Sequence, residues 1–268
     1  MFQIGVFATG RGQGSRQLVQ AIHEACQSGR LPARIAFVFS NRDPGEFEAT
    51  DGFFAMVRDM GHPLATYSFR RFRAELGDDP DWRIKYDREV MRRLEPFEPD
   101  LCVLAGYLMI FGPEMCRRYT SVNLHPAAPG GPVGMWQQVI WDLIEARAPS
   151  SGNTIFSVTE ELDKGPTVTY CTFPLTGGGI DGAWSAVEGI PVQRLREESG
   201  EELELFRLIR ERGMVRERPL VVETLRAFAQ GAVRIEGGRV VNARAEPVRG
   251  IDLTDDIETR LPRSADAS

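Results

Sequence analysis

The stretch FQIGVFATGRGQGS, residues 2–15, contains the signals that decide the fold. Its first seven residues are mostly apolar, which is typical of a strand whose two faces are both covered. Glycines follow at positions 10, 12 and 14, and residues 15–28 then place apolar side chains at helical spacing. A buried strand, a glycine-rich turn and a helix in this order predict the start of a doubly wound α/β sheet.

Short apolar runs and amphipathic stretches continue to alternate as far as residue 173. We predict strands at residues 34–40, 64–66, 101–105, 121–124, 154–158 and 167–173, and helices at residues 51–60, 81–94 and 134–146. Strands separated by helices pair in parallel, so the predicted fold class is α/β with a mostly parallel, Rossmann-like sheet. The site of such a sheet lies at the carboxyl ends of its strands.

The pattern changes after residue 173. Residues 182–213 are rich in charged residues and have a helical composition, but their apolar residues show only weak periodicity. A further helix is predicted at residues 219–230. Two short strands around Gly237-Gly238 predict a small C-terminal β-hairpin. We therefore expect one domain over residues 1–245 and an acidic, loose tail over residues 246–268.

Composition narrows the classes of partner. The chain has 268 residues, 42% of them hydrophobic, and a formal net charge of -6, which is compatible with one sizeable core. No Lys/Arg block stands out, so a nucleic-acid partner is disfavoured. Because we find neither a basic leader nor an apolar run of the ~20 residues that a membrane helix needs, we expect a cytoplasmic protein without a membrane partner.

Four cysteines are present, and their spacing does not indicate a metal or disulfide framework. None forms a C-x-x-C pair, and no histidine lies at ligand spacing from them. We expect no metal site. The cysteines are Cys26, Cys102, Cys116 and Cys171.

The glycine-rich turn at residues 10–15 allows two interpretations. Glycines let the backbone approach an anion, and a helix N-terminus offers unpaired N–H groups and a favourable dipole, so the turn could bind a phosphate. Alternatively, it is a tight turn with Ser15 as the N-cap of the following helix.

The segment SVNLHP, residues 121–126, carries the second motif. Alternate residues of a strand share a face, so Asn123 and His125 point the same way at a carboxyl end of the sheet. A histidine there can donate a hydrogen bond or a proton, and an amide can stabilise an oxyanion. We expect the other two histidines, His23 and His62, to be surface residues without a role.

The third motif is TEELDKGP, residues 159–166, in a predicted loop. An acid in this loop, such as Asp163, could orient His125 and stabilise its charged form. The alternative is a charged turn.

Together the motifs identify a resemblance to the glycinamide ribonucleotide formyltransferase family over residues 2–245. The motifs that carry it are GQGS (residues 12–15), FSNR (39–42), YDRE (86–89), VLAGY (103–107), NLHP (123–126) and ELDKGP (161–166). The resemblance implies transfer of a formyl group from 10-formyltetrahydrofolate to the primary amine of a small phosphorylated acceptor, glycinamide ribonucleotide, in purine biosynthesis. It also implies that no metal takes part.

The same resemblance implies roles for individual residues. Asn123 and protonated His125 would stabilise the oxyanion formed when the amine attacks the formyl carbon, and Asp163 would keep His125 charged. The expected folate contacts are Arg83, Leu108, Met109, Ile110, Phe111, Thr159, Glu160, Glu161 and Leu162. The expected acceptor contacts are Gly12, Gln13, Gly14 and Ser15 for the phosphate and Glu217 for the ribose.

Several positions depart from the family pattern. Met109 stands where the family usually has arginine, Lys164 follows the catalytic acid, and Met135-Trp136-Gln137 replaces a histidine-containing stretch. An insertion enlarges residues 177–213 on the acceptor side. Four alternatives therefore stay open: formylation of another amine such as an amino sugar nucleotide, methionyl-tRNA formylation, formyltetrahydrofolate hydrolysis, and a non-catalytic folate- or nucleotide-binding paralogue. The acidic tail argues against methionyl-tRNA formylation. The sequence leaves the oligomeric state, monomer or homodimer, open.

Overall fold

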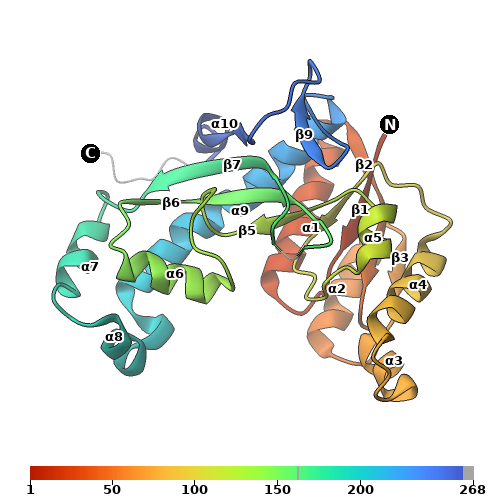
Figure 1. Ribbon diagram of the computed structural model, residues 1–268, viewed down its shortest axis with the longest axis horizontal. Coiled ribbons are helices and arrows are strands. Elements are labelled where there is room, and N and C mark those ends of the chain that lie inside the picture. Colours follow the sequence, from red (N-terminus) through yellow and green to blue (C-terminus); the bar gives the residue numbers. More distant parts are fainter. Residues whose placement is uncertain (162, 262–268) are drawn as a thin grey trace. The chain divides into compact units, whose positions relative to one another are not determined.

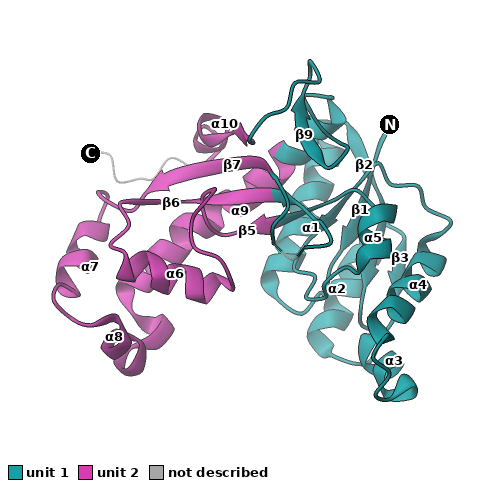
Figure 2. Cartoon of the chain, viewed as in Figure 1, with its two compact units in different colours: residues 1–123, 156–166, 224–249 teal, residues 124–155, 167–223, 250–268 magenta. Residues whose placement is uncertain are grey.

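The computed structural model describes residues 1–161 and 163–261 and has the alternating α/β architecture that the sequence predicts. The chain divides into two compact units, coloured teal and magenta in Figure 2. Unit 1 comprises residues 1–123, 156–166 and 224–249, and unit 2 comprises the remaining described residues. The single domain expected over residues 1–245 stays a prediction.

Unit 1 begins with the strand, turn and helix of the opening stretch. Its strands include β1 (Phe2–Phe7), β2 (Ala33–Ser40), β3 (Leu64–Thr66), β4 (Leu101–Leu104) and the first residues of β5 (Ser121–His125), and its helices include α1 (Gln13–Gln27), α2 (Glu48–Asp59), α3 (Phe69–Leu76), α4 (Trp82–Leu94) and α5 (Pro113–Arg118). β1 pairs in parallel with β2 and β4, β2 with β3, and β4 with β5. Figure 1 shows α1 and α2 on one side of these strands and α3, α4 and α5 on the other, which explains the continuous apolar runs.

Aromatic side chains form much of the core on the α4 side of the sheet. The rings of Phe7, Phe37 and Phe39 are fully buried and pack against Tyr86 from α4 and Met115 from α5. α4 buries Tyr86, Val90 and Leu94, which are spaced by four residues and so lie on one helical face. The helix predicted at residues 81–94 is thus present, and the sheet covers this face of it.

The parallel pairing decides where a site can form in unit 1. Because β1, β2, β3 and β4 all run the same way, the turns that follow them lie at one edge of the sheet. These turns contain the glycine-rich residues 10–14, the SNR segment at residues 40–42, and residues 105–112, which begin with the last three residues of the VLAGY motif.

The helix α3 of unit 1 was not predicted from the sequence. α3 follows β3, and its first turn is capped by Ser68, whose Oγ accepts a hydrogen bond from the N–H of Arg71 at 3.2 Å. Phe69 and Phe72, three residues apart, pack against the aromatic core. The signal was therefore present as a Ser N-cap followed by two apolar residues, but three arginines in an eight-residue helix obscured it.

Unit 2 contains residues 182–213, in which the sequence shows no clear periodicity of apolar residues. Its elements include α6 (Trp136–Glu145), β6 (Ser150–Ser157, the last two residues in unit 1), β7 (Thr167–Pro174), α7 (Ile180–Ala186), α8 (Val192–Glu198), a 3-10 turn (Gly200–Glu202) and most of α9 (Glu204–Ala229). Apolar side chains of α7, α8 and α9, including Ile180, Leu195 and Phe206, pack with α6 in one core. The insertion at residues 177–213 is thus three packed helical segments, and their short lengths explain the weak periodicity. The separate helix predicted at residues 219–230 is wrong, because α9 continues through Pro219.

The C-terminal part confirms one prediction and corrects another. β8 (Val233–Glu236) and β9 (Arg239–Asn242) form the predicted antiparallel hairpin, with positive φ at Gly237 and Gly238. The loose tail expected from residue 246 instead forms β10 (Ile251–Asp252), which pairs in parallel with β7, and α10 (Thr254–Glu258). Ile257 is fully buried, so this segment is ordered by burial that its acidic composition concealed. Residues 262–268 lie outside the described part.

Eight strands hydrogen-bond in the order β10-β7-β6-β5-β4-β1-β2-β3, and the β8-β9 hairpin is separate. The predicted fold class, a mostly parallel doubly wound sheet with a small hairpin, is confirmed. Among the described residues, no helix combines the length and the apolar character that crossing a bilayer requires.

Candidate active site

Asn123 and His125 lie two residues apart at the carboxyl end of β5, so their side chains leave the strand on the same face. Both are half-buried. Nε2 of His125 lies 2.8 Å from the carbonyl oxygen of Pro132. A carbonyl oxygen can only accept, so Nε2 carries a proton and donates it. The strand therefore ends in an imidazole N–H donor held by the Pro-rich loop that follows it.

The loop of the third motif places Asp163 at the surface of unit 1. Asp163 adopts a left-handed backbone with φ 55°, a conformation that aspartate tolerates better than most side chains. Nζ of Lys164 lies 3.3 Å from Oε2 of Glu161, so the lysine is paired with Glu161. The Oγ1 of Thr159 donates to the carbonyl of Glu161 at 3.0 Å, and Glu160 pairs with Arg117 at 2.5 Å. Leu162, an expected folate contact, lies outside the described residues.

Gly165 shows why this loop needs a glycine. A Cβ placed on Gly165 would lie 1.6 Å from the carbonyl oxygen of Ser157, which belongs to β6. Backbone atoms cannot yield that much space, so only glycine fits between the loop and the strand.

The glycine-rich turn leads directly into α1. Gly12 is the N-cap of the helix, with extended backbone and no capping side chain. Ser15 lies inside the helix, 5% exposed, so the interpretation of Ser15 as the N-cap is wrong. Among the described residues, no atom outside the neighbouring backbone lies within 4 Å of a Cβ placed on Gly12 or Gly14. The first N–H groups of this 15-residue helix have no side-chain cap, which is the arrangement that favours an anion.

The loop that follows β4 is held at both ends by buried side chains of unit 1. The N–H of Leu108 donates to Oγ1 of Thr9 at 3.1 Å, and the N–H of Gly112 donates to Oδ2 of Asp87 at 2.7 Å. Thr9 and Asp87 are 1% and 5% exposed. Burial raises the pKa of Asp87 to about 6, and the Gly112 N–H and Arg83 oppose that shift.

The expected folate contacts in this loop are unevenly exposed. Leu108 and Ile110 expose 63% and 40% of their surface, Met109 is half-buried, and Phe111 belongs to the aromatic core. Two exposed apolar side chains beside a fixed backbone can cover a flat, partly apolar ligand. Arg83 lies one helical turn before Asp87 on α4, half-buried, with its guanidinium 5.0 Å from the centre of the Trp82 ring.

Glu217 lies in unit 2 and is already engaged. Its Oε1 lies 2.6 Å from Nη1 of Arg210, and the two side chains are 16% and 25% exposed. The guanidinium of Arg210 also lies 4.7 Å from the centre of the Trp136 ring. Sequence reasoning did not identify Arg210, because it falls in the insertion, for which the family motifs give no counterpart.

The remaining nucleophiles do not suggest a further reactive centre. The four cysteines are free thiols, and burial raises the pKa of Cys26, Cys116 and Cys171 to about 11 each. A thiol with so high a pKa is a poor nucleophile at neutral pH. In residues 1–161 and 163–261, no three His, Cys, Asp or Glu side chains gather closely enough to hold a metal ion.

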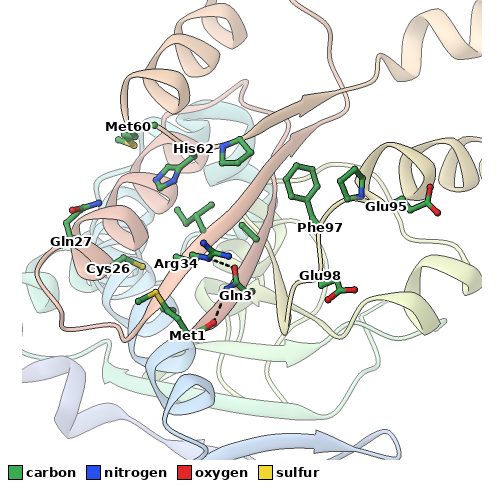
Figure 3. A pocket seen from close by; sticks show the side chains of 16 residues that line it. Met1, Gln3, Cys26, Gln27, Arg34, Met60, His62, Glu95, Phe97 and Glu98 are labelled. Carbon is green, nitrogen blue, oxygen red and sulfur yellow. Dashed lines mark hydrogen bonds between the residues drawn. The ribbon is translucent and has the colours of Figure 1, made fainter.

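The other two histidines are not isolated surface residues, and the expectation that they have no role stays a prediction. Nδ1 of His23 lies 2.9 Å from Nε2 of His62, and both rings are half-buried. His62 lines a hollow of about 890 Å³ in unit 1 (Figure 3), together with Cys26, Arg34 and Phe97. Because Gln3 and Arg34, at the beginning of β1 and β2, also line it, the hollow lies at the amino ends of these strands. It is therefore separate from the carboxyl edge that carries the motifs.

The sequence of this chain matches a known protein family. Residues 4–176 match the family model described as formyl transferase. Over 169 residues the chain is 27% identical to the phosphoribosylglycinamide formyltransferase of Escherichia coli (strain K12), and the match covers 62% of this chain and 71% of that protein.

Solved structures give the same picture. Glycinamide ribonucleotide transformylase 1 from Symbiobacterium toebii matches 90% of this chain and 93% of its own, at 25% identity and a TM-score of 0.63. A formyltetrahydrofolate deformylase from Pseudomonas syringae pv. tomato str. DC3000 also has a TM-score of 0.63, at 21% identity, over 90% of this chain and 65% of its own. The second likeness concerns the fold alone.

Proposed function

This chain belongs to the formyl transferase family, and we propose that it transfers a formyl group from 10-formyltetrahydrofolate to the amine of glycinamide ribonucleotide. That it is a folate-dependent formyltransferase follows from the family and its relatives. The identity of the acceptor is the proposal. The relatives that carry the name of that acceptor support its identity. The single observation in this chain that carries the formyl-transfer chemistry is the N–H of His125, which donates at the end of β5 on the same face as Asn123.

In this proposal His125 and Asn123 act on the formyl oxygen. Attack of the acceptor amine on the formyl carbon places negative charge on that oxygen, and N–H donors aimed at it stabilise the transition state. The Nε2–H of His125 is one donor, and it would exchange the Pro132 carbonyl for the substrate. The side-chain amide of Asn123 is the other. Loss of one such donor lowers the rate by about 10²–10³.

Asp163 supplies the acid of the motif. Its carboxylate would stabilise the charged form of His125 and help to move the proton from the attacking amine to the leaving nitrogen. The pairing of Lys164 with Glu161 supports this role, because the lysine charge has an exposed partner of its own.

The donor is proposed to bind along Leu108, Met109, Ile110 and Phe111, with Arg83 and residues 159–162 as further contacts. Fixed N–H groups on either end of this loop and two exposed apolar side chains support that assignment. 10-Formyltetrahydrofolate supplies the electrophilic formyl carbon. The acceptor phosphate is proposed to bind at Gly12, Gln13, Gly14 and Ser15, where the N–H groups of α1 have no capping side chain.

The test is an assay of deformylated folate product from a 10-formylfolate donor, with and without glycinamide ribonucleotide. We expect turnover only with the ribonucleotide, and His125→Ala should lower kcat by at least about 10². His23→Ala is the matched control, because His23 lies in α1 away from the motif and should leave kcat unchanged. Turnover without any amine would instead identify a deformylase, and an unchanged rate in His125→Ala would refute the assigned role.

A second acceptor is favoured by one observation. Glu217, the expected ribose contact, is paired with Arg210, whose guanidinium lies over the Trp136 ring, and the family pattern predicts neither Arg210 nor Trp136. Another phosphorylated amine, such as an amino sugar nucleotide, is therefore the alternative acceptor. Turnover with such an amine and none with glycinamide ribonucleotide would select it. Cytoplasmic location stays a prediction, and so does the absence of a nucleic-acid partner.

A further inference from the structure

Two arginines of unit 1 converge at the carboxyl ends of neighbouring strands. Arg42 follows β2 directly, and Arg70 lies in the first turn of α3, which follows β3. Both guanidinium groups contact the same ring: Cζ of Arg42 lies 4.2 Å and Cζ of Arg70 5.5 Å from the centre of Phe47. Two like charges held against one ring repel each other, so an anion between or beside them would stabilise the arrangement.

The acidic side chains nearby already have partners. Glu46 is the acidic residue whose negative charge acts on Arg42. Its carboxylate accepts hydrogen bonds from the hydroxyl of Ser68 and from the N–H of Asp43. Asp43 is paired with Arg71 at 3.1 Å. Glu46 therefore offsets part of the positive charge of the two arginines, while the charge of Asp43 is taken up by Arg71.

Arg42 also has an unused donor. Its Nη1 is buried and has no hydrogen-bond partner among the described residues, and a buried donor without a partner costs free energy. Burial lowers the pKa of this guanidinium, Glu46 opposes the shift, and the positive charges of Arg70 and Arg11 add to it. Asn41, which precedes Arg42 and is 4% exposed, likewise has a buried Oδ1 without a partner.

Hydrogen bonds connect this arginine pair to the glycine-rich turn. The Oγ of Ser40 donates to the carbonyl of Thr9 and accepts from the N–H of Arg42, at 3.3 Å in each case. Thr9 immediately precedes the turn that contains Arg11 and leads to the uncapped start of α1. The arginine pair and the N–H groups of α1 therefore lie at adjacent strand ends of one sheet edge.

We propose that Arg42 and Arg70 complete a phosphate-binding site with the first turn of α1, and that its ligand is the phosphate of the formyl acceptor. Guanidinium groups bind phosphate through paired, charge-assisted hydrogen bonds, which helix N–H groups alone do not provide. The first half of this inference is independent of the proposed function, and the second half rests on it.

The first experiment measures binding of inorganic phosphate to the full chain by ³¹P NMR titration. Arg42→Gln should weaken phosphate binding about tenfold or more, since it removes a charged hydrogen-bonding partner. Arg70→Gln should weaken it less, because Arg70 is exposed. Arg92→Gln is the matched control: it removes the same charge from an exposed pair, and Glu89 keeps Arg93 as its partner. Equal affinity in all four proteins would overturn the site.

The second experiment measures KM for acceptor and donor separately. Arg42→Gln should raise the acceptor KM about tenfold and leave the donor KM unchanged, and Arg42→Lys should restore part of the loss because it keeps the charge without the planar fork. Folding is checked by the thermal unfolding midpoint, and the exposed Arg70 offers a variant that leaves the core untouched. Phosphate binding that depends on Arg42, with an unchanged acceptor KM, would overturn the assignment to the acceptor.

The two failures are distinguishable. If glycinamide ribonucleotide is not a substrate at all, the proposed acceptor is wrong, and the phosphate titration still tests the arginine site. If the ribonucleotide is formylated and Arg42→Gln changes neither phosphate affinity nor KM, the arginine site is wrong and the proposed function stands.

Discussion

Two loops of unit 1 carry expected site residues, and the fold holds them in opposite ways. Residues 105–112 are fixed by hydrogen bonds to Thr9 and Asp87, both nearly fully buried. The Asp163 loop, residues 158–166, is tied to strands at its ends, where the N–H of Val158 donates to the carbonyl of Ser121 and the N–H of Ser157 donates to the carbonyl of Pro166. Between these ends its contacts are exposed: the Lys164–Glu161 pair has both side chains 74% exposed. Buried hydrogen bonds are costly to break, whereas exposed ion pairs contribute little. We therefore expect a preformed donor loop, and an Asp163 loop that can adjust when substrate binds.

The largest expected effect concerns the close backbone contact of Gly165, near the end of the Asp163 loop. In Gly165→Ala the new Cβ would meet the carbonyl oxygen of Ser157 at 1.6 Å, so loop or strand must move. We expect the free energy of unfolding to fall by at least ~3 kcal/mol, as for severe overpacking, measured by urea denaturation. Gly182→Ala is the control, since its Cβ meets nothing within 4 Å. A loss below ~1 kcal/mol would show that this loop is adjustable throughout.

The second prediction tests the buried support of the donor loop through pH. The folded-state pKa of Asp87 is raised from 3.8 to about 6, so its protonated form is favoured by folding. Its contribution to stability is present below pH 3.8 and is lost as pH rises through about 6, by up to ~3 kcal/mol for a shift of this size. Asp87→Asn cannot ionise, so its stability advantage over the parent chain should be largest at pH 8 and shrink towards pH 4. A constant difference across this range would contradict the buried carboxylate.

The third prediction separates support of the donor loop from general stability. Asp87→Ala removes the acceptor of the Gly112 N–H, and the loop should lose its fixed end. We expect the donor KM to rise about tenfold, which corresponds to ~1.4 kcal/mol, with the acceptor KM unchanged. Asp87→Asn retains an oxygen acceptor and should keep most of the donor affinity. If both variants raise both KM values equally, Asp87 supports the fold and not this loop.

The smallest effect is expected at the surface of the other loop. Lys164→Gln removes an exposed ion pair with Glu161, and stability should change by less than ~0.5 kcal/mol. Activity should change little as well, because the lysine charge already has a partner. A fall in kcat of tenfold or more would mean that Lys164 contributes to the reaction and would remove the contrast between the two loops.

Much of unit 1 was predictable because local pattern and tertiary environment agree there. The apolar runs became β1, β2 and β4, and the spacing of Tyr86, Val90 and Leu94 became the buried face of α4. In unit 2, the short helices α7 and α8 each bury only one side of two turns, which leaves too few residues for a clear period. β10 and α10 were missed for a related reason, since one buried residue such as Ile257 gives no pattern.

By itself, the sequence determined the α/β class, the hairpin around Gly237-Gly238, and the presence of Asn123 and His125 on one face of a strand. These follow from periods of two and 3.6 residues and from turn chemistry, which act over short distances along the chain. Only the tertiary structure decided that Asp87 holds Gly112, that Glu217 is bonded to Arg210, and that Arg42 and Arg70 share the ring of Phe47. The Asp87 and Arg70 contacts join residues more than 20 positions apart, and even the Arg42 and Glu217 contacts depend on where turns and helices place the side chains. Which groups face one another across such contacts is set by packing, burial and charge balance, and no local pattern encodes them.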